Sequence, residues 1–504
     1  MEPLVEISAG RLRGRREPPG VEVFRGIPYA AAPTGPLRFR APVPAEAWGG
    51  VLDASRFGPA PMQSVSSIYA GGLPGNRVAE VSEDCLTVNV WTPGRSGRRP
   101  VMVWVFGGAY LTGGSAIGTY DGARLALEQD VVVVSFNYRM GALGFLLVEG
   151  GDSNCGLRDQ MAALRWVRDN IAAFGGDPAN VTGFGESAGA GSLLHLLACP
   201  DAAGLLSRAV LQSPGVDHTL VADQAGAVAR SVMEAAGVDR PGRLWDLPAE
   251  AVLAAQEATL PGLMASVGSM PLHPVVDGSF LPGKPGVVLA APEVDLLVSW
   301  TAEEMRLYPD TRADEGGRPL LARWLRRLIT ARTGADPGEA ETAQLLDFYA
   351  PAGTGADIWA AIRTDCVMRL PARRVALRHA AAVAAAGSGR RTYVAQFDWG
   401  AEGGPWRRGA FHAIDLPFTF GTLDRAGWLE FLGAAGPDDR GAGRVARAHM
   451  QAWGAFARSG DPGWACYPDE AMRLDAEPVA GPDPLAAAAR AWAGLWSDDG
   501  PGTA

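Results

Sequence analysis

The arrangement in this sequence with the clearest chemical potential is a serine set between two glycines. Ser187 is the centre of Gly-Glu-Ser-Ala-Gly at residues 185–189, after the β-prone run 181–184 and before a helix-like stretch at 190–198. A strand-to-helix corner of this kind turns so sharply that glycine fits best at the flanking positions. The turn exposes the hydroxyl, and the following helix directs free N–H groups and its positive end toward it. The pattern indicates a nucleophile elbow, and a surface turn that contains serine is the alternative.

A serine at such a corner needs a base to take its proton, and histidine is the usual one. The chain has six histidines: His195, His218, His273, His379, His412 and His449. His195 falls in the helix after the elbow, and His379 and His449 fall in helix-like stretches, so packed or solvated roles are expected for them. His412 lies in a loop-like segment late in the chain, as expected for enzymes in which the order is serine, acid, histidine.

The acid that would orient this histidine should follow a strand between the two residues. A strand-like run at 296–299 is followed closely by Glu303 and Glu304, and the spacing does not separate these two carboxylates. Asp277 and Asp295 are weaker alternatives. The backbone donors of an oxyanion hole need a loop after an earlier strand, and the small residues in 106–110 follow the buried run 101–105.

Strand-like and helix-like segments alternate along the chain, which predicts an α/β fold with a large, mostly parallel sheet and helices on both faces. Continuous apolar runs predict buried strands, and apolar residues at helical spacing predict helices. The strands are expected at 21–30, 86–91, 101–106, 131–136, 181–184, 209–212, 296–299 and 393–397, and the helices at 159–174, 190–198, 219–258, 323–333, 342–349, 372–386 and 443–458. We expect one domain over 1–504, with helical insertions at about 219–290 and 305–390 that cover the active site.

The amino-acid composition and net charge of the chain limit which kinds of molecule it is expected to bind and where it is expected to reside. The net charge of −10 argues against nucleic acid as a partner, because phosphate binding requires a basic face. No apolar run reaches the roughly 18 residues of a membrane span, and the first residues lack the pattern of a signal peptide. The five cysteines are scattered without the spacing of metal ligands, which predicts reduced thiols and a cytoplasmic protein. Neither composition nor charge separates a monomer from a homodimer.

Further segments give the chain a resemblance to a known family, the type-B carboxylesterases, which include the cholinesterases. The resemblance extends from about residue 8 to 475. It is carried by Phe24–Ala30, Arg38–Arg40, Glu83–Leu86, Asn137–Arg139, Gly141–Phe145, Trp166–Ile171, Phe174–Pro178 and Phe456–Pro462, together with the elbow. It implies an α/β-hydrolase fold, a small-molecule ester substrate, and no metal or organic cofactor.

The resemblance also implies roles for individual residues. They are Ser187 as nucleophile, Glu304 as acid, His412 as base, the N–H groups of Gly108, Ala109 and Ala188 as oxyanion donors, and Ser213 behind the acid. The preference for Glu304 over Glu303 depends on this resemblance alone. Two other functions use the same fold: a catalytically dead relative that binds partners, and a hydrolase that cleaves amides. Dead relatives lose the serine or the histidine, and this chain retains both.

The sequence departs from the family pattern at several positions. Met305 stands where the family usually has glycine after the acid. Cys85 matches one half of a family disulfide, and Pro61 occupies the expected partner position, so Cys85 is expected to be unpaired. No tryptophan occurs between residues 63 and 83, so the aromatic platform that cholinesterases offer to a quaternary ammonium is expected to be missing. Arg38 and Glu83 are expected to form an ion pair.

The ester itself is not specified by the sequence. Pockets for the acyl and alcohol groups are expected between residues 219 and 330. Within that range Met264, Met270 and Leu272 are equally compatible with a pocket wall and with the core.

Overall fold

The fold is built on one large, mostly parallel sheet, shown in the computed structural model for residues 2–64, 73–74, 78–266, 270–285, 291–401, 409–425 and 427–495. Across these residues the strand order is β16-β15-β14-β13-β12-β11-β9-β10-β8-β4-β3. The strands of this sheet are β3 (Arg15–Glu17), β4 (Val21–Pro28), β8 (Thr87–Thr92), β9 (Arg99–Val105), β10 (Val132–Phe136), β11 (Gly176–Glu186), β12 (Arg208–Gln212), β13 (Asp295–Thr301), β14 (Thr392–Phe397), β15 (Ala471–Leu474) and β16 (Val479–Gly481). Small separate sheets form from β1 (Leu4–Ile7), β2 (Gly10–Arg13) and β5 (Val51–Asp53), and from β6 (Ala60–Pro61) and β7 (Val81–Ser82).

The middle of the sheet is parallel, and its strands are buried on both faces. Parallel pairing joins β10, β9, β11, β12, β13, β14 and β15 in that order, and the flanking pairs toward β3 and β16 are antiparallel. The valine-rich strands β9 and β10 lie within the main apolar core, as continuous apolar runs predict. Because neighbouring parallel strands end at the same edge, the residues that follow β9, β11, β12 and β13 are brought together there.

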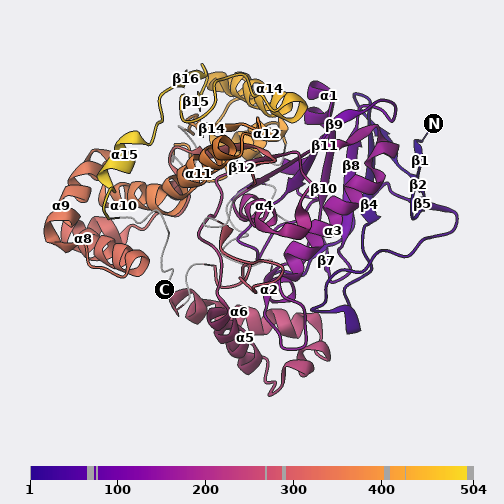
Figure 1. The fold of residues 1–504 in the computed structure, drawn as a ribbon, viewed down its shortest axis with the longest axis horizontal. Helices are drawn as coiled ribbons and strands as arrows, with labels where there is room; N and C mark the ends of the chain where they lie inside the picture. Colours follow the sequence, from indigo (N-terminus) through magenta and orange to yellow (C-terminus); the bar gives the residue numbers. More distant parts are fainter. Residues whose placement is uncertain are drawn as a thin grey trace.

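Helices cover both faces of this sheet (Figure 1). α3 and α4 pack on one face of β11, and α1 and α14 pack together on the other side. The helices are α1 (Ala123–Gln129), α2 (Gly141–Phe145), α3 (Cys155–Asn170), α4 (Ala188–Ala198), α5 (Ala222–Ala235), α6 (Ala249–Ser266), α8 (Arg312–Thr333), α9 (Gly338–Tyr349), α10 (Gly355–Arg363), α11 (Leu370–Ala386), α12 (Leu416–Phe420), α13 (Trp428–Leu432), α14 (Ala442–Ser459) and α15 (Ala486–Ala491).

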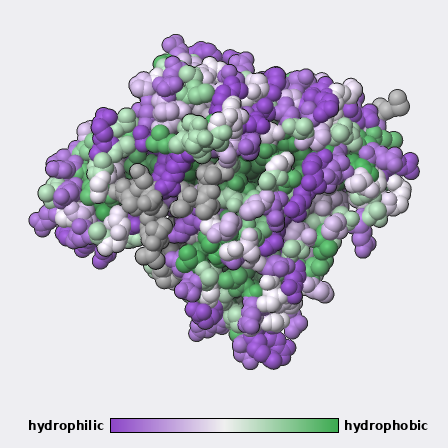
Figure 2. Space-filling view, viewed as in Figure 1, coloured by the Kyte–Doolittle hydropathy of each residue, from purple (hydrophilic) through white to green (hydrophobic). Residues whose placement is uncertain are grey.

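Two groups of helices extend from the sheet and flank its carboxyl edge. α5 and α6 pack against each other around their own apolar cluster at the bottom of Figure 1. α8, α9 and α10 form a second group with its own cluster at the left, and a π-helix at Thr364–Arg369 joins α10 to α11. Figure 2 shows hydrophobic residues gathered near the middle of this face, between the two groups. These helices lie within the two ranges expected to hold insertions.

Most of the predicted elements are present, with ends shifted by a few residues. α3 begins at Cys155 rather than 159, and α4 begins directly after the elbow serine. The prediction omitted β15, β16, α10 and α15, which are short and have no strong periodicity. The segment between residues 63 and 83, where the aromatic platform is expected to be missing, falls largely outside the described residues. No helix in the described ranges is long and apolar enough to cross a membrane.

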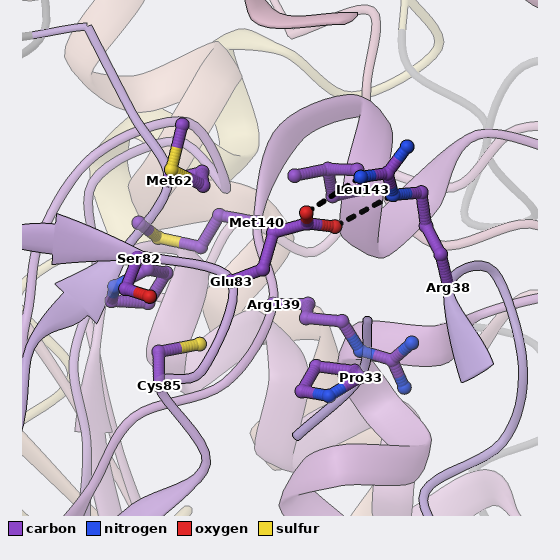
Figure 3. A pocket seen from close by; sticks show the side chains of 10 residues that line it. Pro33, Arg38, Met62, Ser82, Glu83, Cys85, Arg139, Met140 and Leu143 are labelled. Atoms are coloured by element: carbon purple, nitrogen blue, oxygen red, sulfur yellow. Dashed lines mark hydrogen bonds and ion pairs between the residues drawn. The ribbon is translucent and has the colours of Figure 1, made fainter. Parts of the chain in front are cut away.

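Two expectations are confirmed: Cys85 is unpaired, and Arg38 forms an ion pair with Glu83. All five cysteines of the chain are free thiols, and Cys85 is buried. It lines a small cavity with Pro61, and the same cavity shows the expected ion pair between Arg38 and Glu83 (Figure 3). Arg38 Nε and Nη2 donate to the two Glu83 carboxylate oxygens at 2.7 and 2.6 Å. Burial raises the pKa of the Cys85 thiol well above its ordinary value, so this thiol is inert.

Candidate active site

Ser187 occupies a strained corner between β11 and α4. Its φ of 55° and ψ of −121° lie in a region that L-residues rarely adopt. A Cβ at Gly189 would approach the Val105 carbonyl oxygen to 2.0 Å, and one at Gly185 would lie 2.8 Å from the same oxygen. The corner therefore requires glycine on both sides of the serine, as the motif predicts. Ser187 is half-buried and lines a cavity, so its hydroxyl is accessible.

His412 and Glu304 form a buried hydrogen-bonded pair at the same edge of the sheet. His412 Nδ1 lies 2.6 Å from Glu304 Oε2, and the His412 backbone N–H donates to the Glu304 carbonyl at 3.0 Å. Glu304 follows β13 and is fully buried, and His412 is 7% exposed. The structure thus brings together a carboxylate and a histidine that are 108 residues apart in sequence.

Glu304 is held as a carboxylate by three donors. Oε1 accepts from Ser213 Oγ at 2.5 Å and from the Thr301 backbone N–H at 2.8 Å. Burial alone would raise the pKa of Glu304, but the charge of His412 and hydrogen bonds from His412, Ser213 and Thr301 outweigh it, and the pKa is lowered. Ser213 itself follows β12 and has a φ of 46°. It lies behind the acid, in the position that the family resemblance implies.

The three alternative carboxylates have other partners. Glu303 is partly exposed and lies 2.7 Å from Arg306 Nε, and it accepts from the Ala410 backbone N–H at 3.0 Å. It therefore anchors the loop before His412 rather than the imidazole. Asp277 accepts hydrogen bonds from Ser153, Asn154, Ser279 and Leu281. Asp295 begins β13, at the opposite end of the strand, where it lies 3.2 Å from Arg390 Nη1 and accepts from the Arg391 backbone N–H.

The second imidazole nitrogen of His412, Nε2, faces the carboxylate of Glu186, a residue that was not predicted to belong to the site. His412 Nε2 lies 3.1 Å from Glu186 Oε1, and no hydrogen bond joins His412 to Ser187 in the described residues. Burial raises the pKa of Glu186. Burial alone would lower the pKa of His412, but the carboxylates of Glu186 and Glu304 outweigh it and hold that pKa above its ordinary value. In the sequence, the position of Glu186 directly before Ser187 was the feature that could have identified it as a site residue.

A third buried acid, Asp415, lies close to Glu186 and His412. Asp415 follows His412 by three residues, and its Oδ2 accepts from Gln212 Nε2 at 2.7 Å. Burial raises the pKa of Asp415 to about 6, although the hydrogen bond from Gln212 opposes this shift. This contact has no signal in the sequence, because Gln212 and Asp415 are 203 residues apart.

The loop after β9 supplies backbone N–H groups next to the serine. Gly108 and Ala109 line the same cavity as Ser187 and have positive φ values of 118° and 56°. A Cβ at Gly107 would lie 2.6 Å from the Glu186 carbonyl oxygen and 3.0 Å from Ser187 Cβ, so this loop packs directly against the elbow. Ala188 is the first residue of α4, where N–H groups have no partner within the helix. Across the described residues, the N–H groups of Gly108, Ala109 and Ala188 donate to no protein acceptor.

A cavity of about 470 Å³ opens onto the serine, the histidine and this loop. Met264, Met270 and Met305 contribute to its wall, whereas Leu272 is buried in the α5–α6 cluster. The cavity also includes Tyr308 from the segment after Glu304, Arg363 from the end of α10, and Val367 and Met368 from the π-helix. Met305, at the position where the family usually has glycine, therefore contributes a large side chain to the cavity.

Four of the remaining histidines are buried and His218 is partly exposed, and three of the buried ones form hydrogen bonds away from the serine. His195 contacts the Gly191 carbonyl and Thr219 Oγ1, His379 contacts Thr392 Oγ1, and His449 contacts Thr419 Oγ1. The packed roles expected for these three are confirmed. His218 lines the cavity, and burial lowers its pKa to about 4, so it is neutral. Within the described ranges no group of three or more His, Cys, Asp or Glu side chains has the arrangement of a metal site.

Serine hydrolases with the α/β-hydrolase fold carry their reactive groups at the carboxyl edge of such a sheet, and this chain is one of them. Residues 1–473 match the model of the carboxylesterase family. The protein therefore belongs to the carboxylesterase family and is a carboxylic-ester hydrolase. The fold class and the enzyme class predicted from the sequence are confirmed.

Individual relatives match this chain over almost its full length. The chain is 34% identical over 502 residues to a para-nitrobenzyl esterase of Bacillus subtilis, covering 95% of this chain and 96% of that one. It is 36% identical to a phenmedipham hydrolase of Pseudarthrobacter oxydans, over 91% and 90% of the two chains. Among solved structures, a PNB esterase superposes with a TM-score of 0.84 at 33% identity, covering 97% of this chain and 99% of that one. A Geobacillus stearothermophilus carboxylesterase superposes with a TM-score of 0.81 at 36% identity, with the same coverage.

Proposed function

We propose that the protein hydrolyses small-molecule carboxylic esters through an acyl-enzyme on Ser187, with His412 as base and Glu304 as acid. The observation that carries this proposal is the 2.6 Å contact between Glu304 and His412 Nδ1, beside the strained serine in one cavity. Glu304 fixes the imidazole with a proton on Nδ1, so Nε2 is the nitrogen that accepts once the imidazole is neutral. In the free enzyme Nε2 faces Glu186, and substrate binding transfers this contact to the serine hydroxyl.

The reaction proceeds by two acyl transfers. Ser187 Oγ attacks the acyl carbon while its proton passes to His412 Nε2, and the N–H groups of Gly108, Ala109 and Ala188 stabilise the oxyanion. The bond to the alcohol oxygen breaks, and the imidazolium returns the proton to the leaving alkoxide. Water then gives a proton to His412 and attacks the acyl-enzyme, which releases the acid and restores the serine. Ser213 is a positioning residue for Glu304, and no metal or organic cofactor takes part.

Three proposals concern the setting of the reaction and the unit that carries it out. The five free thiols support a reducing compartment, which we propose to be the cytoplasm. The net charge of −10 supports a partner other than nucleic acid. We also propose that the whole chain acts as one domain, because one apolar cluster of the three includes residues from Val5 to Leu485.

The test is hydrolysis of a graded series of 4-nitrophenyl esters, from acetate to decanoate, with 4-nitroanilides of the same acids. We expect ester turnover in the wild type and loss of several orders of magnitude in kcat for Ser187→Ala. Ser207→Ala, which changes a surface serine, serves as the matched control. No turnover of any ester would support the catalytically dead alternative. Comparable turnover of the anilides would extend the activity to amides.

A further inference from the structure

The half-buried Arg363 places its guanidinium in the wall of the active-site cavity. It ends α10, directly before the π-helix at Thr364–Arg369, and it lines the same cavity as Ser187. Its Nη2 donates to the Tyr308 carbonyl, and its Cζ lies 5.9 Å from the centre of the Trp359 ring. Its Nε is enclosed by protein, and its Nη1 is accessible and has no hydrogen-bond partner among the described residues. The N–H groups of Nη1 are therefore the donors that a ligand in the cavity can reach.

The carboxylates nearest to Arg363 are already paired with other arginines. Asp310 receives hydrogen bonds from Arg312 Nε and Nη2 at 2.8 and 2.5 Å. Asp365 lies 2.5 Å from Arg369 Nη2. No carboxylate oxygen lies within ion-pair distance of Arg363 in the described part of the chain.

The other titratable groups around Arg363 do not neutralise it. Burial raises the pKa of the neighbouring Cys366 thiol to about 12, so this thiol is uncharged at neutral pH. Burial lowers the pKa of Arg363 itself, and the charges of Cys366 and Asp310 only partly oppose that effect. Arginine nevertheless stays protonated in proteins. Within the cavity, Glu186 is already in contact with His412.

The surrounding contacts fix Arg363 in place relative to the catalytic edge. Thr364 Oγ1 accepts from the Met305 backbone N–H at 3.0 Å, and Met305 directly follows Glu304. With the bond from Arg363 to the Tyr308 carbonyl, this links the end of α10 to the segment that carries the acid. The wall of the cavity that Arg363 lines also includes Met264, Met270, Met305, Val367 and Met368. In such surroundings a charged contact is stronger than in water.

We propose that Arg363 is an anion subsite that binds a carboxylate of the substrate, so the preferred substrates are carboxylic esters that carry a second, free carboxylate. This substrate class rests on the proposed function. The guanidinium is planar and presents parallel N–H donors that match a carboxylate, which makes arginine the appropriate residue for this contact. The carboxylate can belong to the acyl part or to the alcohol part of the ester.

Two pairs of substrates test the subsite and separate these sources. On the acyl side, 4-nitrophenyl hydrogen adipate is compared with 4-nitrophenyl heptanoate. On the alcohol side, the hexanoate ester of 4-hydroxybenzoate is compared with that of 4-hydroxybenzamide. In at least one pair, Arg363→Gln should lower the ratio of kcat/KM for the anionic over the neutral ester by about 10- to 100-fold. Arg363→Lys should recover part of the ratio, and Arg323→Gln, which removes an exposed charge from α8, should retain it in full.

An equal ratio in wild type and Arg363→Gln for both pairs would overturn the subsite while leaving ester hydrolysis intact. If the wild type hydrolysed none of the four esters, the result would instead contradict the proposed function. Calorimetric titration with adipate and with 1,6-hexanediol tests the subsite without turnover. Adipate should bind the wild type about 10-fold or more tighter than Arg363→Gln, with hexanediol as the uncharged reference. Equal affinity of both proteins for adipate would overturn the proposal.

Discussion

Glu304→Gln is the substitution with the most sharply defined consequence in this site. The side chain keeps its size, and Oε1 of the native residue accepts from two fixed donors, Ser213 Oγ at 2.5 Å and Thr301 N–H at 2.8 Å. Glutamine has only one acceptor oxygen, so that oxygen remains with these two donors. Its amide N–H₂ then faces His412 Nδ1, which must become the acceptor in that contact.

This reversal places the imidazole proton on Nε2, the atom that must accept the serine proton. The imidazolium that forms during acylation also loses a buried negative charge 2.6 Å away. A wrong tautomer together with a lost charge costs about 10⁴ in kcat in a Ser-His-acid triad, so we expect a drop of at least about 10³ here. That corresponds to about 4 kcal/mol of transition-state stabilisation. Folding should be retained, since the hydrogen bonds to Oε1 persist.

The assay is kcat for a 4-nitrophenyl ester, with a melting curve for each variant. Glu303→Gln is the matched control, because Glu303 is partly exposed and its neutral amide oxygen can still accept from the Ala410 N–H. We expect this variant to stay within a few-fold of wild type. The reverse pattern would assign the acid to Glu303. Activity retained in both variants would refute the role of this segment, and Asp277 and Asp295 would be tested next.

Two further predictions concern protonation and thiols. Because the carboxylates of Glu186 and Glu304 raise the pKa of His412 and only the neutral imidazole acts as base, kcat/KM should rise with pH through an apparent pKa above about 6.5. Glu186→Gln removes one of these charges and should move that rise to lower pH, whereas an unchanged or higher pKa would contradict the electrostatic account. Alkylation of unreduced, unfolded protein should modify all five cysteines, as read by intact mass. A disulfide that includes Cys85 would be inconsistent with this structure and with a reducing compartment.

The sequence predicted the parts of the site that local backbone geometry dictates. The two glycines around Ser187 are required because Val105 and Gly189 backbone atoms would collide with any Cβ there. The order serine, acid, histidine selected His412, and the strand before Glu303 and Glu304 located the acid to two residues. Distinguishing those two depended on family resemblance, because only the fold shows which carboxylate faces the imidazole.

The contacts that the sequence could not predict join segments far apart in the chain. Met264 faces the cavity and Leu272 faces the core, although both are apolar residues in the same region. The contact between Glu186 and His412 joins residues that only the closing of the sheet edge brings together. Arg363 is indistinguishable in sequence from the many surface arginines, and its role depends on the lack of a partner in the folded chain.

The most direct test of the central claim is covalent labelling with a fluorophosphonate, which reacts with an activated serine and forms a stable adduct. Intact mass and peptide mapping should show one adduct per chain, on the peptide that contains Ser187, with loss of ester hydrolysis in proportion to labelling. The Ser187→Ala variant should acquire no adduct and show no ester turnover above background. Labelling at another residue, or Ser187→Ala protein that hydrolyses esters at the wild-type rate, would contradict the assignment of Ser187 as the nucleophile.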